Sequence, residues 1–331
     1  MYQAPPFTIT QRMLDLVFRI GERISRIDGY ESLDPSPRLR KQNLIRSVHS
    51  SCAIEANSLS LEQVSDVING RRVIGPKKDI DEVKNAYEAY AGLGSFDPYS
   101  MEELLRIHGI MTKGTAEESG RFRSKGEGVF SGDECIFMAP PPEQVPGNMV
   151  NLFEWLNATR GEVNALIASC VFHYELVFIH PFTDGNGRMA RLWQTAILGS
   201  WRPVFHRIPV ENRIEMTQQE YYEAIDRCNR AGDSTVFVEF MLQTILNAVE
   251  DAEHALKEDV RRPSARVSRL TDAMEEGTWY ASKELMGRVG MASYPNFLTY
   301  YLRPAVECGM VDLEFPDTPR ARGQRYRLRA Y

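Results

Sequence analysis

The sequence of 331 residues predicts a mainly helical protein that carries one short β-hairpin and ends in a small α+β module. Three observations indicate this fold class. Apolar residues recur at helical spacing over most of the chain up to Lys257, the helical period stops between Gly120 and Pro142, and the composition changes after Lys257. The length is ample for a sizeable core and for two or three domains.

The periodicity predicts a succession of helices. Ser60 with Gln63, and Ser100 with Glu103, have the spacing of capping boxes and mark two helix starts. The expected helices cover residues 10–27, 37–56, 61–69, 80–91, 101–111, 143–158, 163–178, 187–200, 218–230 and 235–257. In the interruption, residues 126–132 followed by 135–138 predict a short hairpin closed by Ala-Pro-Pro-Pro. A plain surface connection is the alternative interpretation.

A polar segment with a proline, residues 258–264, follows the last of these helices and predicts a domain boundary. Beyond it we expect short helices at 265–274, 283–289 and 294–307, and strands at 310–315 and 324–328. The predicted organisation is an N-terminal helical region over residues 1–75, a core over 76–260 and a C-terminal domain over 263–331.

The composition, 43% hydrophobic and 25% charged, is typical of a soluble globular protein. No apolar run approaches the roughly 18 residues that span a bilayer, and the first residues lack the features of a signal peptide, so we expect a cytoplasmic protein without a membrane partner. Five cysteines without a Cys-x-x-Cys pair argue against a disulfide scaffold or a zinc site. A net charge of −6 gives no sign of a general nucleic-acid binder.

Residues 180–191, His-Pro-Phe-Thr-Asp-Gly-Asn-Gly-Arg-Met-Ala-Arg, join two of the expected helices. Gly185 and Gly187 flank Asn186, and such a trio tolerates positive φ and lets backbone N–H groups point into one concavity, as anion-binding nests require. The positive end of the following helix dipole adds to that concavity. The joint therefore predicts a phosphate site.

The charged residues of the same segment indicate chemistry beside the phosphate site. Arg188 and Arg191 fall on one face of the first helical turns, where the dipole disfavours cations, so a strong anion is expected nearby. Asp184 offers a carboxylate oxygen suited to Mg²⁺, and His180 has an intrinsic pKa suited to proton abstraction near neutral pH. Phe182 is assigned to packing.

The segment resembles, without gap or substitution, the His-x-Phe-x-(Asp/Glu)-Gly-Asn-Gly-Arg-x-x-Arg signature of Fic-domain proteins, which typically transfer AMP from ATP to a hydroxyl side chain of a target protein. The resemblance implies that His180 deprotonates the target Ser, Thr or Tyr, whose oxygen attacks the α-phosphate as pyrophosphate leaves. It also implies a Mg²⁺ ligand, a phosphate cradle and two phosphate clamps: Asp184; Gly185, Asn186 and Gly187; Arg188 and Arg191. Because relatives that phosphorylate carry Lys at position 187, Gly187 favours nucleotidyl transfer.

A second signal lies upstream, on the helix expected over residues 37–56. Glu55 falls on the same apolar stripe as Val48 and Cys52, and a carboxylate on a buried face needs a partner, for which a structural salt bridge is one interpretation. Ser51-Cys-Ala-Ile-Glu55 also resembles the autoinhibitory (Ser/Thr)-x-x-x-Glu motif of many Fic proteins, whose Glu pairs with the second motif arginine, here Arg191.

The family pattern continues with Gly or Asn, whereas this chain has Ala56 and then Asn57. The resemblance implies that Glu55 takes the place of the ATP γ-phosphate and keeps the resting protein a poor enzyme. The same Glu55 could instead orient a water molecule for removing AMP, and the site could transfer another nucleotide. These alternatives stay open.

Two further elements are assigned through the resemblance. The hairpin corresponds to a flap whose edge holds the target segment as an added strand, which places Val129, Phe130, Ser131 and Gly132 over the active site. Tyr222 and Asn229, seven apart on one helical face, combine an aromatic surface with an amide for a nucleobase, and the resemblance adds Tyr221. A core role for the Tyr pair is the alternative.

The C-terminal elements resemble the winged-helix module often fused behind Fic domains. Its arginines would make a basic wing on a DNA-binding regulator, or a solvated hairpin that supports dimerisation or target docking: Arg320, Arg322, Arg325, Arg327 and Arg329. A third interpretation is a metal-dependent hydrolase built on His173, His180 and Asp184. The absence of a third nitrogen or sulfur ligand argues against a zinc site of this kind.

The sequence as a whole thus predicts a Fic-type helical bundle with a β-hairpin flap and a winged-helix domain. The predicted activity is that of a protein adenylyltransferase that uses ATP and Mg²⁺ on a target protein or on itself. Self-association as a homodimer remains open.

Overall fold

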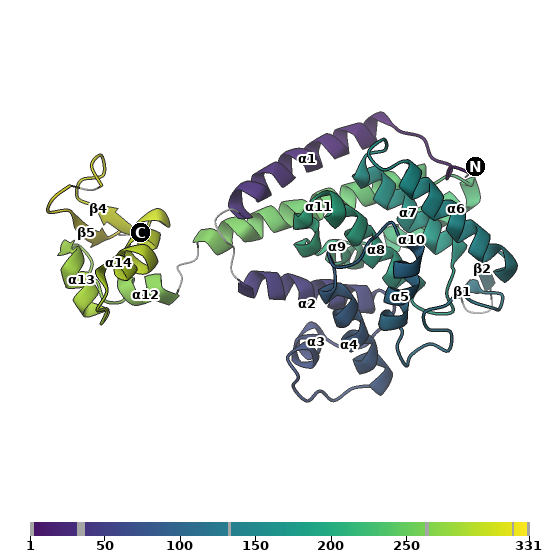
Figure 1. Cartoon of the computed structure of the whole chain (residues 1–331), viewed down its shortest axis with the longest axis horizontal. Helices are drawn as coiled ribbons and strands as arrows, with labels where there is room; N and C mark the ends of the chain where they lie inside the picture. Colours follow the sequence, from purple (N-terminus) through teal and green to yellow (C-terminus); the bar gives the residue numbers. More distant parts are fainter. Residues whose placement is uncertain (1–2, 32–36, 132–133, 262–264, 320, 330–331) are drawn as a thin grey trace. The chain divides into compact units, whose positions relative to one another are not determined.

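Figure 1 shows the computed structural model of the chain, which is mainly helical as predicted. The described residues are all those of the chain except 1–2, 32–36, 132–133, 262–264, 320 and 330–331. They form two compact units, the larger one ending at Glu253 and the smaller one beginning at His254.

The larger unit contains all of the helices expected before residue 257, with ends that shift by a few residues. In chain order its elements are α1 Gln11–Glu31, α2 Pro37–Ala53, α3 Leu61–Ile68, α4 Lys77–Ala91, α5 Met101–Met111, β1 Gly128–Ser131, β2 Glu134–Met138, the 3-10 turn η1 Pro142–Gln144, α6 Val145–Ala158, α7 Ala165–Ile179, α8 Asn186–Trp201, the 3-10 turn η2 Pro203–Arg207, α9 Val210–Met216, α10 Gln218–Ala231 and the start of α11 Thr235–Arg261. The sequence did not predict α9, whose seven residues are too few to show a helical period.

The core of the larger unit is built around α7 and α8. Both helices are buried on nearly every side, which explains why α7 is apolar all round rather than along one stripe. Helix α6 packs against α7, while α2, α5 and η2 pack against α8. Trp193 of α8 is fully buried and stacks on Phe96, with ring centroids 5.2 Å apart. The loop that joins α7 to α8 carries the motif over residues 180–191.

Helices α1 and α11 run side by side along one edge of the larger unit (Figure 1). Charged pairs tie them together: Arg23 of α1 bonds Glu250 at 3.0 Å and Glu253 at 2.8 Å on α11. At the other end of α1, the Thr10 hydroxyl donates to Glu239 at 2.6 Å. The N-terminal helix is thereby joined to the scaffold that carries the site.

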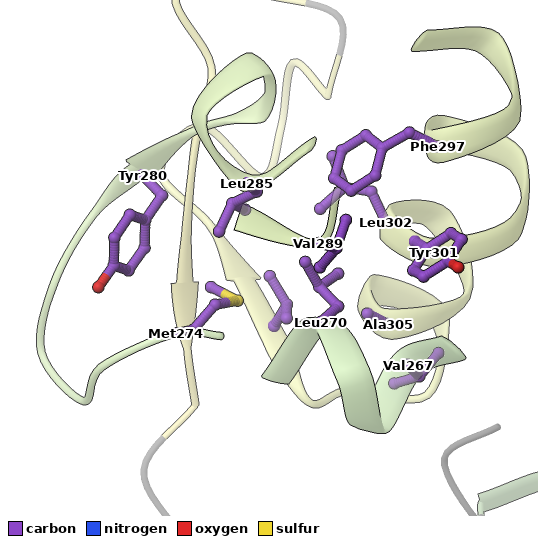
Figure 2. Packing of buried hydrophobic residues seen from close by; sticks show 11 residues of the cluster. Val267, Leu270, Met274, Tyr280, Leu285, Val289, Phe297, Tyr301, Leu302 and Ala305 are labelled. Carbon is purple, nitrogen blue, oxygen red and sulfur yellow. The ribbon is translucent and has the colours of Figure 1, made fainter. Parts of the chain in front are cut away.

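The smaller unit is an α+β module with its own hydrophobic core (Figure 2). Its elements are α12 Ala265–Thr271, β3 Tyr280–Ala281, α13 Ser282–Arg288, α14 Tyr294–Phe297, the π-helical turn η3 Leu298–Leu302, α15 Arg303–Glu307, β4 Val311–Leu313 and β5 Arg325–Leu328. The strands pair antiparallel in the order β3-β5-β4. Strand β3 was not predicted, because two residues carry no alternation.

A proline explains the π-helical turn between α14 and α15. Pro304 has no N–H group to donate to the carbonyl of Tyr300, four residues earlier, so the helical ladder is interrupted there. Phe297, Tyr301 and Leu302 nevertheless face the core that Figure 2 shows, so the three short segments bury one continuous face.

Two of the arginines expected in the C-terminal hairpin are bound within the unit. Arg329 Nε donates to Asp312 at 2.9 Å, and Arg327 lies 3.6 Å from the same carboxylate with its guanidinium 4.7 Å from the centre of the Trp279 ring. These two arginines therefore hold β5 to its neighbours. Arg320 lies outside the described residues.

No helix in the part of the chain that the structure describes is both long and apolar enough to cross a membrane. Cys52, Cys170 and Cys228 are buried and unbridged, and Cys308 is unbridged as well. The side chain of Cys135 lies outside the described part.

Candidate active site

The motif loop begins and ends with residues in the left-handed backbone region. His180 follows the last residue of α7 with φ 50°, and its N–H donates to the carbonyl of Leu176 at 3.0 Å. A non-glycine residue there costs about 1–2 kcal/mol, so the surrounding contacts have to hold it. Gly185 closes the loop with φ 84° as the N-cap of α8, where glycine adopts this conformation without strain.

Phe182 and Asn186 fix the loop between these two points. Phe182 is fully buried, as predicted, and its ring stacks on His108 with centroids 3.6 Å apart. The Asn186 amide bonds both backbone groups of Phe182, accepting from its N–H at 2.9 Å and donating to its carbonyl at 2.7 Å. The Asn186 side chain is thus used inside the loop, and a phosphate would meet its backbone N–H at the start of α8.

His108 of α5 holds the motif loop by a hydrogen bond, a role that the sequence did not predict. Its Nδ1 accepts from the N–H of Gly120 at 3.0 Å, so the ring proton is on Nε2, which donates to the carbonyl of Asp184 at 3.0 Å. Burial lowers the pKa of His108 to about 4, which keeps this tautomer neutral at physiological pH.

His180 is set up to accept a proton. Its Nδ1 lies 3.3 Å from the carbonyl of Val177, a contact that requires the proton on Nδ1 and leaves a lone pair on Nε2. Burial lowers the pKa of His180 below its usual 6.5. The ring is therefore mostly neutral near pH 7, the state that a general base needs.

Arg123 links the motif loop to the base of the hairpin, and the sequence did not point to it. Its guanidinium is buried and donates to the carbonyls of His180 at 2.7 Å, Lys125 at 2.8 Å and Pro140 at 2.5 Å. Its backbone N–H donates to the carbonyl of Pro181 at 2.9 Å. The planar fork of the guanidinium bonds these three carbonyls at once, so Arg123 fixes His180 relative to the hairpin.

The hairpin itself lies where the sequence predicted it. Strand β1 pairs antiparallel with β2, with Gly128 opposite Met138 and a shift of register after Val129. Val129, Phe130 and Ser131 are on β1, whereas Gly132 lies outside the described residues. Their role in holding a target segment stays a prediction.

Arg188 is buried between two carboxylates. Its Nη2 donates to Asp184 at 2.7 Å, and its Nη1 lies 3.6 Å from Glu82 of α4. Burial on its own would lower the pKa of Arg188, but Asp184 and Glu82 outweigh it and raise the pKa above its usual value. Nε and Nη1 nevertheless make no hydrogen bond to the described part of the chain. Buried donors of this kind favour an anionic ligand.

Arg191 is held by the end of α2. Its Nη2 donates to Glu55 Oε1 at 2.8 Å and to the carbonyl of Ser51 at 2.9 Å, and its Nε donates to Ser51 Oγ at 3.2 Å. Burial opposes the charge of Arg191, but Glu55, Tyr221 and Tyr90 together outweigh it and raise the pKa of Arg191. The contact predicted between Glu55 and Arg191 is therefore present, although the side chain of Glu55 remains 36% exposed.

The Glu55 carboxylate also lies against the start of α8. A Cβ atom at Gly187 would be 2.1 Å from Glu55 Oε1 and 3.1 Å from Arg191 Nη1. A side chain at position 187 and the carboxylate of Glu55 thus cannot occupy this space together. Glycine at this position allows Glu55 to approach the positive end of the α8 dipole.

Helix α2 ends in a Schellman motif that directs the side chain of Glu55 toward Arg191. The N–H of Ala56 donates to the carbonyl of Ala53 at 2.9 Å and the N–H of Asn57 to that of Cys52 at 3.1 Å. Ala56 has φ 63°, the conformation that glycine usually supplies at this position. The departure from the family pattern at Ala56 therefore leaves the turn intact, at the cost of some strain.

The two tyrosines of α10 have different surroundings. Tyr221 is buried, and its hydroxyl lies 2.9 Å from Nε2 of His173, so it belongs to the core, as the alternative reading proposed. Tyr222 is 44% exposed, and its hydroxyl donates to the carbonyl of Ile54 at 3.2 Å. Asn229 accepts from the hydroxyl of Tyr174 at 3.0 Å. Tyr222 is therefore the exposed tyrosine of this pair, and its contact with a nucleobase stays a prediction.

The hydrolase reading that used His173 is wrong. Both of its ring nitrogens are occupied, Nδ1 by Gln194 at 2.6 Å and Nε2 by Tyr221, and burial lowers its pKa to about 3. The described residues contain no group of three or more His, Cys, Asp or Glu side chains that could hold a metal ion. His173 is a core histidine.

Comparisons with known proteins find Fic relatives over both units. Residues 98–198 match the model of the Fic/DOC family, and residues 265–329 match that of the C-terminal domain of "Filamentation induced by cAMP protein Fic-like". The chain is 28% identical to protein adenylyltransferase Fic of Nematostella vectensis over 81% of its length, and 29% identical to protein adenylyltransferase fic-1 of Caenorhabditis elegans over 70%. It spans 62% and 45% of those two proteins.

A solved structure covers nearly the whole chain. The crystal structure of a Fic family protein from Desulfovibrio desulfuricans G20 aligns over 99% of both chains, with 42% sequence identity and a TM-score of 0.76. Both compact units are thus shared with that protein. The chain belongs to the Fic family.

Proposed function

We propose that the protein transfers AMP from ATP to a Ser, Thr or Tyr hydroxyl of a target protein, or to one of its own. The observation that carries this proposal is the arrangement at the start of α8, where Arg188 Nε, Arg188 Nη1 and Arg191 Nη1 are buried without a hydrogen-bond partner in the described chain. A polyphosphate would satisfy them. The activity named for the relatives in Nematostella and Caenorhabditis supports the proposal.

The reaction follows from the neutral state of His180. Its Nε2 takes the proton of the target hydroxyl, the hydroxyl oxygen forms a bond to the α-phosphorus of ATP, and the bond from that phosphorus to the β-phosphate oxygen breaks. Pyrophosphate leaves and AMP remains on the target. Arg188, Arg191 and the dipole of α8 stabilise the charge that develops on the phosphate oxygens.

The site also fits Mg²⁺. One oxygen of Asp184 bonds Arg188, and the other makes no hydrogen bond within the described residues. The side chain is 35% exposed, which suits a cation that keeps most of its waters and takes one protein carboxylate together with phosphate oxygens. Asp184 would hold the ion, and the ion would neutralise charge on the polyphosphate.

We further propose that the resting protein is inhibited by its own Glu55. The carboxylate occupies Arg191 Nη2 and the space next to Gly187, so a terminal phosphate at this end of α8 would meet a negative charge in its place. The contact between Glu55 and Arg191 is compatible with inhibition of AMP transfer and with orienting a water molecule for AMP removal. An experiment distinguishes transfer from removal.

Intact-mass spectrometry after incubation with Mg·ATP tests the proposal. Glu55→Gly should gain the mass of AMP faster than wild type, and His180→Ala in the Glu55→Gly background should gain nothing. A gain of phosphate alone, or equal gains in the presence and absence of His180, would overturn the proposed reaction. Wild type as active as Glu55→Gly would overturn the inhibition. Loss of AMP from a modified target would assign the reverse activity.

The C-terminal unit is, in our proposal, a winged-helix module whose arginine hairpin is structural. The bonds of Arg327 and Arg329 to Asp312 support this interpretation over that of a DNA-binding wing. The protein should therefore pass a duplex-DNA column without salt-dependent retention. Retention that falls steeply with salt would favour the regulator instead.

A further inference from the structure

We propose that Asn57 and Glu82 form a latch that holds the inhibitory segment, residues 51–57, on the active site and couples it to Arg188. This inference rests on the proposed function and adds a regulatory contact to it. Its central observation is that one buried carboxylate, Glu82, bonds the inhibitory segment on one oxygen and faces a motif arginine on the other.

Asn57 forms the segment's side of the latch. It lies two residues beyond Glu55, and its Nδ2 donates both to Glu82 Oε2 at 3.0 Å and to the carbonyl of Asp79 at 3.1 Å. Its Oδ1 accepts from the N–H of Leu59 at 3.2 Å, so the amide is fixed in this orientation. Because Asn57 is also the last residue of the Schellman turn, its position sets that of Glu55.

Glu82 forms the other side. Its side chain is only 10% exposed, and its Oε1 lies 3.6 Å from Arg188 Nη1 and 3.8 Å from Lys78 Nζ. A buried carboxylate is stable only when it is paired. Each motif arginine therefore faces a carboxylate from outside the motif, Arg191 that of Glu55 and Arg188 that of Glu82.

The segment is held on two flanks. On the α4 side, the N–H of Ser58 donates to the Asp79 carboxylate at 2.9 Å, next to the Asn57 contact. On the α10 side, the carbonyl of Ile54 accepts from Gln218 at 3.0 Å and from Tyr222 at 3.2 Å. Glu55 can leave Arg191 by side-chain rotation alone, or the whole segment can move, and only the second route requires Asn57 to release Glu82.

The shared carboxylate makes the two sites interdependent. A polyphosphate on Arg188 takes over the guanidinium that pairs with Glu82, which removes the charge that keeps Glu82 in place and weakens its hold on Asn57. By linkage, release of the segment, which carries Glu55 away from Arg191, favours nucleotide binding to the same extent. The latch therefore opposes nucleotide binding only as long as Glu55 is there to be held.

Asn57→Asp tests the latch without changing the size of the side chain. It places a second carboxylate at hydrogen-bond distance from Glu82, and the repulsion should free the segment. AMP incorporation from Mg·ATP should rise about 10-fold or more over wild type, the ratio expected when a charge-assisted hydrogen bond of the inhibited state is lost. The rise should vanish in the Glu55→Gly background. A merely structural role for Asn57 would not raise activity.

A second substitution restores the bond. With Glu82→Gln, an amide can donate to the carboxylate at position 57, so the double variant should be less active than Asn57→Asp alone. Asn69→Asp is the matched control, because Asn69 ends α3 and bonds Lys41 and Ser65 rather than Glu82. Its activity should equal that of wild type.

Three results would overturn the latch: no rise in Asn57→Asp while Glu55→Gly is active, an equal rise in the Glu55→Gly background, or no restoration by Glu82→Gln. If Glu55→Gly itself transfers no AMP, the proposed function fails, and calorimetric titration with Mg·ATP decides the latch on its own. Asn57→Asp should then bind Mg·ATP about 10-fold more tightly than wild type. Unchanged affinity would overturn the latch.

Discussion

Gly187→Ala tests where the Glu55 carboxylate lies without altering Glu55 itself. The new Cβ would sit 2.1 Å from Glu55 Oε1, the oxygen that bonds Arg191, so the carboxylate has to shift and this bond is weakened or lost. A hydrogen bond between charged groups contributes about 1.5–3 kcal/mol, and the partial exposure of Glu55 reduces this to about 1–2 kcal/mol. Alanine gains up to about 1 kcal/mol over glycine within a helix, which offsets part of the loss.

The substitution should therefore change the free energy of unfolding differently in two backgrounds. In wild type we expect a destabilisation of up to about 1 kcal/mol, and in Glu55→Gly a stabilisation of up to about 1 kcal/mol, because no carboxylate is in the way. Urea unfolding followed by tryptophan fluorescence measures both, since Trp155 and Trp193 are buried in the larger unit. Equal effects in the two backgrounds would refute the placement of Glu55.

Three other predictions concern the turn, the hairpin base and pH. Ala56→Gly should stabilise the larger unit by about 0.5–1 kcal/mol, because glycine relieves the φ of 63° at some cost in unfolded-chain entropy; an unchanged or lower urea midpoint contradicts this. Arg123→Lys should lower the AMP transfer rate of Glu55→Gly about 10-fold or more, since an ammonium cannot serve the same three carbonyls; a rate within about 2-fold contradicts it. Acidification from about pH 7 to about pH 5 should destabilise the larger unit, because the unfolded chain binds protons near pH 6.5 that four histidines of lowered pKa do not bind when folded: His108, with a pKa of about 4, His173, with a pKa of about 3, His180 and His206. These four outnumber Glu175 and Glu211, whose raised pKa values act in the opposite sense. A urea midpoint that rises on acidification would contradict this sign.

The sequence predicted the elements whose information is local. The motif over residues 180–191 is contiguous, so its loop and the start of α8 followed from residue types and spacing. The helices α7 and α8 were predicted from long runs of apolar residues. The Glu55 contact was predicted because Glu55 falls on an apolar stripe and resembles a known motif, and the structure brings it to Arg191.

The rest depends on contacts between elements distant in the sequence. His108 donates to a backbone carbonyl, Arg123 donates to three carbonyls, and Glu82 pairs with the guanidinium of Arg188. No residue spacing in the sequence predicts contacts of this kind. Asn186 has the motif's residue type, but its amide closes the loop instead of facing outward. Tyr221 and Tyr222 are adjacent, so periodicity could not say which of them is buried.

The position of the phosphorus that stays on the protein tests the central claim most directly. Glu55→Gly is incubated with Mg²⁺ and ATP that carries the label on either the α- or the γ-phosphorus, and the protein is then precipitated and counted. The arrangement of His180, Arg188 and Arg191 predicts that the α label is retained, that the γ label is not, and that His180→Ala abolishes retention. Retained γ label, or α label retained equally without His180, would contradict it.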